Sequence, residues 1–214
     1  MESSKIYRFS ASKLERIRKR IGEMQYEIKA VEGWQKSSLS PMNILRLFDK
    51  LRILEGYELV GYIFRRGGNG NGVVWAVPEG ISAELNECKK LDDVLKTPKP
   101  RLAVNPEFVI EVDGSPESYL QKSILLRELY EFGALWHGAS WSLHRIIGRK
   151  PKGFEWFEEV RDLSPKVIMG TKIIVEFYTV SEFIEKAVYM HEDIYDVFRS
   201  REKIVASGGR GYIL

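Results

Sequence analysis

Residues 57–77 read YELVGYIFRRGGNGNGVVWAV, and this stretch decides the predicted fold. Two runs of β-branched and aromatic residues flank a cluster of glycine and asparagine. This pattern is typical of two antiparallel strands joined by a loop that tolerates left-handed backbone conformations. We expect strands over 57–66 and 73–77, with a long loop over 67–72. An early hairpin of this kind favours an α+β fold with a largely antiparallel sheet over a doubly wound parallel sheet.

The clearest amphipathic pattern predicts a helix over 12–32. Ser12 and Glu15 have the spacing of a capping box, in which both side chains accept hydrogen bonds from backbone amides at the helix start. Apolar residues then recur at steps of three and four: Leu14, Ile17, Ile21, Met24, Ile28 and Val31. This seam packs within the chain or pairs with a second copy in a homodimer. The intervening basic residues, Arg18 among them, are expected on a solvated face.

A second amphipathic helix is predicted over 181–201, after a cap at Ser181. Its apolar residues again follow four-three spacing: Phe183, Ala187, Met190, Ile194 and Val197. Caps, glycines and alternation predict the other elements: helices over 40–56 and 115–132, strands over 107–113 and 172–180, and a small hairpin or a tail over 203–214. The predicted architecture is α+β: a mixed, largely antiparallel sheet with an early β-hairpin, packed against amphipathic helices at both chain ends.

Length and composition limit the class of protein. The 214 residues are 44% hydrophobic and 29% charged, which suits a single folded domain over 1–214, with the best candidate for an internal connection near 97–106. No apolar run has the roughly 18 residues of a membrane helix, and the N-terminus lacks the apolar segment of a secretory signal. With Cys88 as the single cysteine, we expect a cytoplasmic protein. Scarce glutamine beside abundant Lys, Arg and Glu is also typical of thermophilic proteins.

The densest group of candidate catalytic residues lies within 136–144. It holds two of the three histidines and two of the five tryptophans. If the segment is helical, Ser140 lies one turn from His137 and can hydrogen-bond to it. The alternatives are a ligand pocket and an ordinary buried stripe with a polar rim. His137 and His144 cannot share a metal, because they are about 10.5 Å apart in a helix and on opposite faces of a strand. The segment alone therefore indicates no metal site and no cofactor.

A pair of acidic residues on the predicted strand 107–113 is a further candidate. Glu111 and Asp113 are two residues apart, so both face one side of the strand. Paired carboxylates can bind a divalent ion or act in acid–base catalysis, although a solvated acidic face is the more common reason for such a pair.

The glycine loop of the hairpin is the leading candidate for binding. Arg65 and Arg66 enter it directly, and successive amides of Gly68, Gly70 and Gly72 can form an anion-binding concavity. The spacing does not match a phosphate-binding loop or a dinucleotide-binding fingerprint, so a plain turn is the structural alternative. Both arginines reach one anion only if strand pairing ends before them.

Three hypotheses of function follow. The first is an intracellular protein that binds an anionic partner, a nucleic acid or a phosphorylated small molecule, through the hairpin loop. The second is a small-molecule enzyme, such as a hydrolase, with residues from the acidic pair and the histidine segment. The third is a structural subunit that pairs through its heptad helices. The candidate catalytic residues are Glu111, Asp113, His137, Ser140 and His144, and the candidate binding residues are Arg65, Arg66, Gly68, Gly70, Gly72, Trp136 and Trp141.

Overall fold

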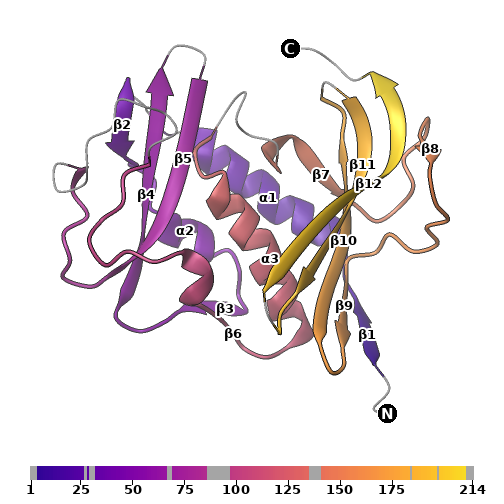
Figure 1. The fold of residues 1–214 in the computed structure, drawn as a ribbon, viewed down its shortest axis with the longest axis horizontal. Helices are drawn as coiled ribbons and strands as arrows, with labels where there is room; N and C mark the ends of the chain where they lie inside the picture. The colour runs from indigo at the N-terminus through magenta and orange to yellow at the C-terminus, as the bar shows by residue number, and fades with distance from the viewer. Residues whose placement is uncertain are drawn as a thin grey trace. The chain divides into compact units, whose positions relative to one another are not determined.

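The computed structural model has the α+β architecture, and every strand pairing among its described residues is antiparallel (Figure 1). It describes residues 4–26, 28, 32–66, 69–85, 97–134, 141–183, 185–196 and 198–210. They form two compact units: Met1–Ile17, Gly114–Ser123 and Leu143–Leu214 make the first, and Arg18–Asp113 and Ile124–Ser142 make the second. Helices α1 (Ala11–Tyr26) and α3 (Pro116–Tyr130) contribute residues to both. The connection near 97–106 lies inside the second unit.

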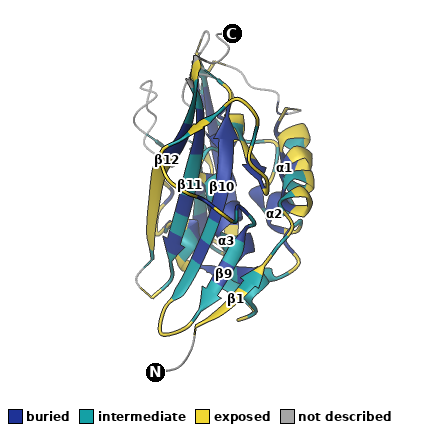
Figure 2. Cartoon of the chain, turned by 90° about the vertical axis from the view of Figure 1, so that its right-hand side faces the viewer, coloured by how far each residue is buried: buried dark blue, intermediate teal, exposed yellow. Residues whose placement is uncertain are grey.

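The first unit is built on one antiparallel sheet. Its strands are β1 (Lys5–Arg8), β7 (His144–Ile147), β8 (Glu155–Trp156), β9 (Lys166–Met169), β10 (Ile173–Ser181), β11 (Glu185–Ile194) and β12 (Arg199–Arg210). The order is β1-β9-β10-β11-β12-β8, and β7 also pairs with β10. Figure 2 shows β10 as largely buried, whereas β12 is exposed over its first half.

The two faces of this sheet carry different side chains. One face holds an apolar cluster that includes Tyr178, Val180 and Val188. Because side chains alternate along a strand, the opposite face carries Thr179 and His191. Most of the polar side chains that are buried in the first unit lie on this second face: Thr179, Ser181, His191 and Asp193.

The second unit contains the hairpin, here β4 (Tyr57–Arg66) and β5 (Asn69–Pro78), and β2 (Gly33–Lys36) beside β4. A two-stranded sheet of β3 (Leu51–Ile53) and β6 (Ile110–Val112), the short helix α2 (Pro41–Leu45) and the 3-10 turns η2 (Pro106–Phe108) and η3 (Trp141–Leu143) complete the described elements of the chain. Both faces of the β4 centre are buried. Tyr62 and Phe64 pack into an apolar cluster with Trp34, so they are not available to stack on nucleic-acid bases.

A buried ion pair joins α1 to α3 within the second unit. The predicted seam of α1 is confirmed at Leu14 and Ile21, which are buried. The helix was expected over 12–32 but spans Ala11–Tyr26, so Ile28, which is also buried, lies beyond its end. The expectation that Arg18 faces solvent is wrong, because its side chain is 7% exposed and its Nε donates to Glu128 Oε1 over 2.8 Å. Arg18 lies between the apolar residues on the same helix face, where a buried carboxylate compensates its charge.

The largest error of the sequence analysis concerns the predicted helix over 181–201. This region forms β11 and the start of β12, so the C-terminal end of the chain contributes strands in place of an amphipathic helix. Smaller corrections are a helix limited to Pro41–Leu45 where 40–56 was expected, a strand limited to Ile110–Val112 within 107–113, and a continuous β12 through Gly208 and Gly209. The strand over 57–66 and the helix from Pro116 are confirmed.

Among the described residues, no helix is both long enough and apolar enough to cross a membrane.

Candidate metal centre

Four polar side chains meet on one face of the first unit's sheet: His144 of β7, Thr179 of β10, His191 of β11 and Glu202 of β12. We call them the histidine cluster. Strand register brings them together, because β7 and β11 both pair with β10 and His191 lies directly opposite Glu202. His144 lies opposite Ser181, two residues from Thr179, and is therefore a diagonal neighbour of Thr179 on the same face.

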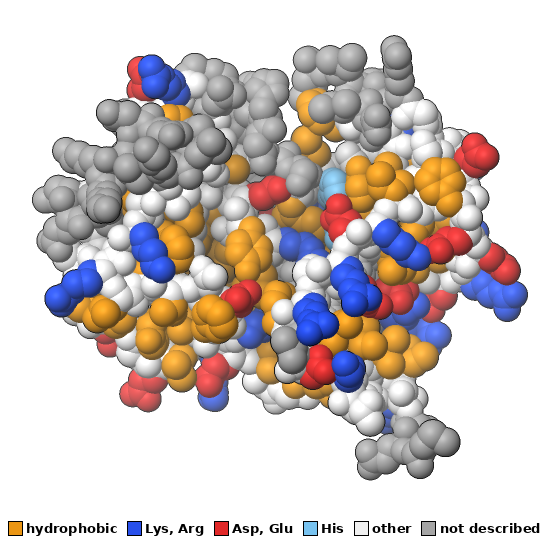
Figure 3. Space-filling model, in the orientation of Figure 1, with side chains coloured by type: hydrophobic (Ala, Val, Ile, Leu, Met, Phe, Trp, Pro, Cys, Tyr) orange, Lys and Arg blue, Asp and Glu red, His pale blue; other side chains and the backbone are white. Residues whose placement is uncertain are grey.

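The Thr179 hydroxyl links the two imidazoles. Its Oγ1 lies 3.0 Å from Nδ1 of His144 and 2.8 Å from Nε2 of His191. On the other side of the His191 ring, Nδ1 is 3.0 Å from Oε2 of Glu202. Thr179 and His191 are buried, His144 is partly buried and the Glu202 side chain is 49% exposed. The cluster thus extends to the surface, and Figure 3 shows histidine surface (pale blue) beside acidic and hydrophobic side chains.

Two aromatic rings pack against these imidazoles. Tyr189 stacks on His144 with ring centroids 4.6 Å apart, and Phe177 stacks on His191 with centroids 4.7 Å apart. A stacked imidazole loses rotational freedom because turning it would break the contact with its neighbouring ring. Packing and the Thr179 hydroxyl together therefore set the directions in which the ring nitrogens point.

The sequence of contacts from Glu202 through His191 to Thr179 has the order of an acid–base–nucleophile triad. In such a triad the carboxylate orients a histidine that activates a hydroxyl for attack on the substrate. The attacking hydroxyl must reach the substrate, but Thr179 is 0% exposed and its oxygen also contacts His144. The cluster therefore does not fit catalysis with Thr179 as nucleophile.

The same side chains fit a transition-metal site. One ligand atom from each of His144, His191 and Glu202 lies within 4.8 Å of the other two. Two imidazoles and a carboxylate are a ligand set of catalytic zinc, with bonds of about 2.0–2.2 Å. Tetrahedral ligand atoms at that bond length are about 3.4 Å apart, so the widest pair must close by at most about 1.4 Å. Oε2 of Glu202 already lies 3.0 Å from Nδ1 of His191, so the wider separations involve His144.

Sequence analysis misses the approach of His191 to Glu202 because it assigns 181–201 to a helix that ends just before Glu202. In a helix, eleven residues separate two side chains by about 16 Å along the axis. In the hairpin of β11 and β12 the same two residues are directly opposite each other. Alternation of Tyr189, His191 and Asp193 on one strand face is the signal that identifies the strand, but helix-favouring residues such as Ala187 mask it.

Several of the predicted site residues near His144 and in the hairpin lie outside the described residues: Gly68, Trp136, His137 and Ser140. Trp141 is described and is buried in the second unit. Its Nε1 donates to Glu128 Oε1 over 2.7 Å, and the Arg18 guanidinium carbon lies 4.1 Å from the centre of its ring. Trp141 thus packs on the buried ion pair between α1 and α3.

The acidic pair lies in the second unit, whereas His144 belongs to the first. Arg52 Nε donates to Glu111 Oε2 over 2.8 Å, and Lys50 Nζ lies 3.9 Å from Asp113 Oδ2. Both carboxylates thus form ion pairs with basic side chains of the same solvated strand face. We assign no catalytic or metal-binding role to Glu111 and Asp113.

The hairpin lacks the geometry that a shared anion site at both arginines needs. A shared anion site requires strand pairing to end before Arg65, and this condition is not met, because Arg65 pairs with Gly70 and Arg66 with Asn69. Adjacent residues on a paired strand face opposite sides. Arg65 donates to the carbonyl oxygens of Phe64 and Gly133, and burial lowers the pKa of its guanidinium. Arg66 Nε lies 3.8 Å from Glu32 Oε1 at the surface, and anion binding there stays a prediction.

Gly72 has a packing role in the same hairpin. A Cβ added at this position would lie 1.6 Å from the backbone oxygen of Phe132. The chain after α3 therefore packs directly against the backbone of β5, and only a residue without a side chain permits this approach.

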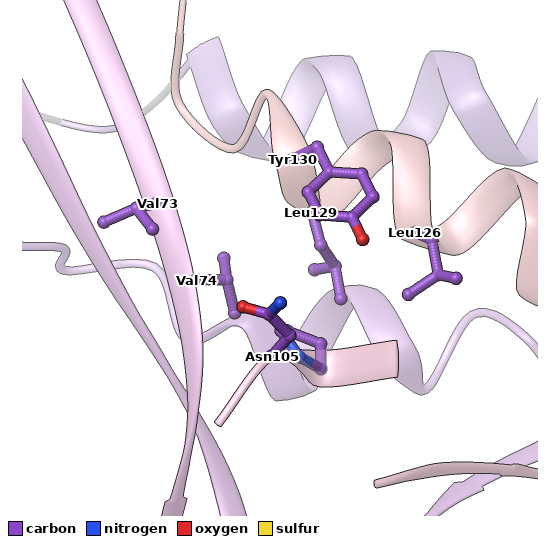
Figure 4. A pocket seen from close by; sticks show the side chains of 7 residues that line it. Val73, Val74, Asn105, Leu126, Leu129 and Tyr130 are labelled. Atoms are coloured by element: carbon purple, nitrogen blue, oxygen red, sulfur yellow. The ribbon is translucent and has the colours of Figure 1, made fainter. Parts of the chain in front are cut away.

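A small apolar cavity lies elsewhere in the second unit. Its volume is about 120 Å³, and it is lined by Val73, Val74, Asn105, Pro106, Leu126, Leu129 and Tyr130 (Figure 4). Tyr130 donates its hydroxyl to Glu107 at the surface. The lining contains no titratable group apart from this tyrosine, so the cavity offers no acid–base or metal chemistry.

Comparison of the chain with family models, with curated proteins and with solved structures gives no match.

Proposed function

We propose that this protein binds a divalent transition-metal ion, with zinc as the best fit, through His144, His191 and Glu202. The observation that carries the proposal is the convergence of three donor side chains from three strands, each with one ligand atom within 4.8 Å of the others. Imidazole and carboxylate suit zinc, and the same donors also suit iron(II) in sites with two histidines and one carboxylate.

Electrostatics also favour a cation at this position. A divalent ion neutralises the Glu202 carboxylate and binds neutral imidazoles by their lone pairs, so His191 can be a ligand without becoming a buried charge. Thr179 supplies the supporting hydrogen bonds that metal-bound histidines usually make through their second nitrogen.

An enzymatic role is the second candidate, and the three donor side chains found among the described residues favour it. Structural zinc sites commonly have four protein ligands, whereas catalytic sites have three and leave a position for water. A bound water of lowered pKa would act as the nucleophile of a hydrolase, which agrees with the hydrolase hypothesis for His144. The test is hydrolysis of an activated ester with and without zinc. Activity that requires zinc and that Glu202→Gln abolishes would support the enzymatic role. A zinc-loaded protein without this activity would be a binding protein only.

Metal affinity tests the main proposal. We expect purified protein, stripped with chelator, to take up one zinc ion per chain in calorimetric titration. Glu202→Gln should lower the affinity by more than about 100-fold, because loss of a ligand exceeds the 10–100-fold effect of losing a supporting hydrogen bond. Glu202 is exposed, so the variant should keep its fold, which circular dichroism checks.

The matched control is Glu192→Gln. Glu192 is next to His191 on β11, but alternation places its side chain on the opposite sheet face, where it lies 4.0 Å from Arg201. This variant removes the same charge from the same sheet and should bind zinc as the unmodified chain does. Equal affinities for all three proteins, or no binding by any of them, would refute the proposal.

A further inference from the structure

We propose that the apolar cavity of the second unit binds a small, neutral organic molecule with an apolar body and one hydrogen-bonding group. Four apolar residues that line the cavity are buried and form its base: Val74, Pro106, Leu126 and Leu129. Asn105 and Tyr130 also line the cavity but are exposed, so they mark its mouth. All of these residues belong to the second unit, and the proposal is therefore independent of the metal site in the first unit.

Regular structure explains the apolar base. Side chains alternate along β5, so Val73 joins the apolar cluster around Trp34 whereas Val74 faces α3 (Figure 4). Leu126 and Leu129 are three residues apart in α3 and therefore share a helix face. A buried water needs about two to four polar partners, which these side chains do not offer. The base therefore favours an apolar group, and the cavity volume of about 120 Å³ suits a ring close to benzene in size.

Asn105 gives the mouth of the cavity a hydrogen-bonding group. It precedes the η2 turn with an extended backbone, which is the position of a capping residue, but its side chain makes no capping hydrogen bond. Within the described part of the chain, no other group bonds to this carboxamide. Figure 4 shows the carboxamide between β5 and α3, where its oxygen can accept a hydrogen bond from a ligand and its nitrogen can donate one.

The charges near the mouth favour a neutral ligand. Tyr130 donates its hydroxyl to Glu107 over 3.0 Å, so a carboxylate lies beside the opening. An anionic ligand would meet this carboxylate without a compensating charge, because no Lys, Arg or His is among the described residues that line the cavity. Glu107 is not among those lining residues either, so an ammonium group inside the cavity would lose its hydration without gaining an ionic partner.

NMR titration of the full chain at neutral pH tests the proposal with three probes that share one ring: phenol, benzene and benzoate. We expect phenol to shift the methyl resonances of Val74, Leu126 and Leu129 with a dissociation constant on the order of 1 mM, because a ligand of so few atoms binds weakly. Benzene should bind about 3- to 10-fold more weakly, since it cannot hydrogen-bond to Asn105. Benzoate should leave these resonances unchanged. No shift with phenol, or equal shifts with phenol and benzoate, would overturn the proposal.

Asn105→Ala isolates the hydrogen bond at the mouth. The side chain is exposed and makes no capping bond, so the variant should keep its fold. Its affinity for phenol should fall about 3- to 10-fold, while its affinity for benzene stays the same. The matched control is Asn43→Ala in α2 of the same unit, where the carboxamide oxygen accepts from Arg46 Nη1 over 2.8 Å and does not line the cavity. Phenol binding that is equal in the two variants would contradict the assignment of Asn105.

Discussion

Replacing Glu128 by Ala should lower the free energy of unfolding by about 3–5 kcal/mol, which is the usual cost of leaving one charge of a buried pair without its partner. Glu128 and Arg18 are each 7% exposed, and Glu128 Oε1 accepts from both Arg18 Nε and Trp141 Nε1. The variant keeps the hydrogen bond from Arg18 Nη2 to the Trp141 carbonyl oxygen but removes the carboxylate that compensates the guanidinium charge. Denaturant melts followed by circular dichroism measure the change.

The control for this prediction is an exposed pair on the same helix. Lys19 and Glu23 lie 3.9 Å apart at 80% and 64% exposure, so solvent screens their attraction. Glu23→Ala should change the free energy of unfolding by less than about 0.5 kcal/mol. A similar, small loss in Glu128→Ala would show that the Arg18 pair does not hold α1 against α3.

The second large effect is expected at Gly72, which sequence analysis assigns to anion binding. Gly72→Ala places a methyl group 1.6 Å from the Phe132 backbone oxygen, which a rotation of a side chain cannot relieve. The backbone after α3 must move away from β5, so we expect a loss of more than about 4 kcal/mol or a failure to fold. Yield of folded protein and its denaturation midpoint measure this loss.

Gly22→Ala is the matched control for Gly72→Ala. A Cβ at Gly22, in α1, has no atom within 4 Å, and alanine is a better helix former than glycine. This substitution should raise the free energy of unfolding by up to about 1 kcal/mol. If Gly72→Ala were tolerated as well as Gly22→Ala, the backbone of Phe132 could not lie as close to Gly72 as the structure places it.

The hairpin and two helices could be predicted because their signals are local. The glycine cluster after Arg66 marks a turn, and Ser115 precedes a helix as predicted. The capping box at Ser12 and Glu15 is wrong by two residues, because α1 begins at Ala11 and Ser10 Oγ accepts from the Lys13 amide. Arg18 shows the limit of such patterns, since helical periodicity places it on the buried face but its charge argues for solvent. The presence of Glu128 on another helix decides between the two.

The candidate site could not be predicted because it depends on strand pairing between distant segments. His144 alone is an ambiguous residue, and nothing adjacent to it in sequence supplies a second ligand. Residues 181–201 satisfy a helical period through Ala187, Met190 and Ile194, while tertiary pairing with β10 and β12 selects the strand. Once that hairpin is formed, register alone places His191 beside Glu202 and across from the strand that carries Thr179.

The most direct test of the metal site is anomalous diffraction from crystals of the zinc-loaded protein, measured above and below the zinc absorption edge. We expect one anomalous peak per chain, with Nε2 of His144, Nδ1 of His191 and a carboxylate oxygen of Glu202 at about 2.0–2.2 Å. Zinc bound elsewhere on the chain, or crystals of zinc-saturated protein with no anomalous density at these three side chains, would contradict the account.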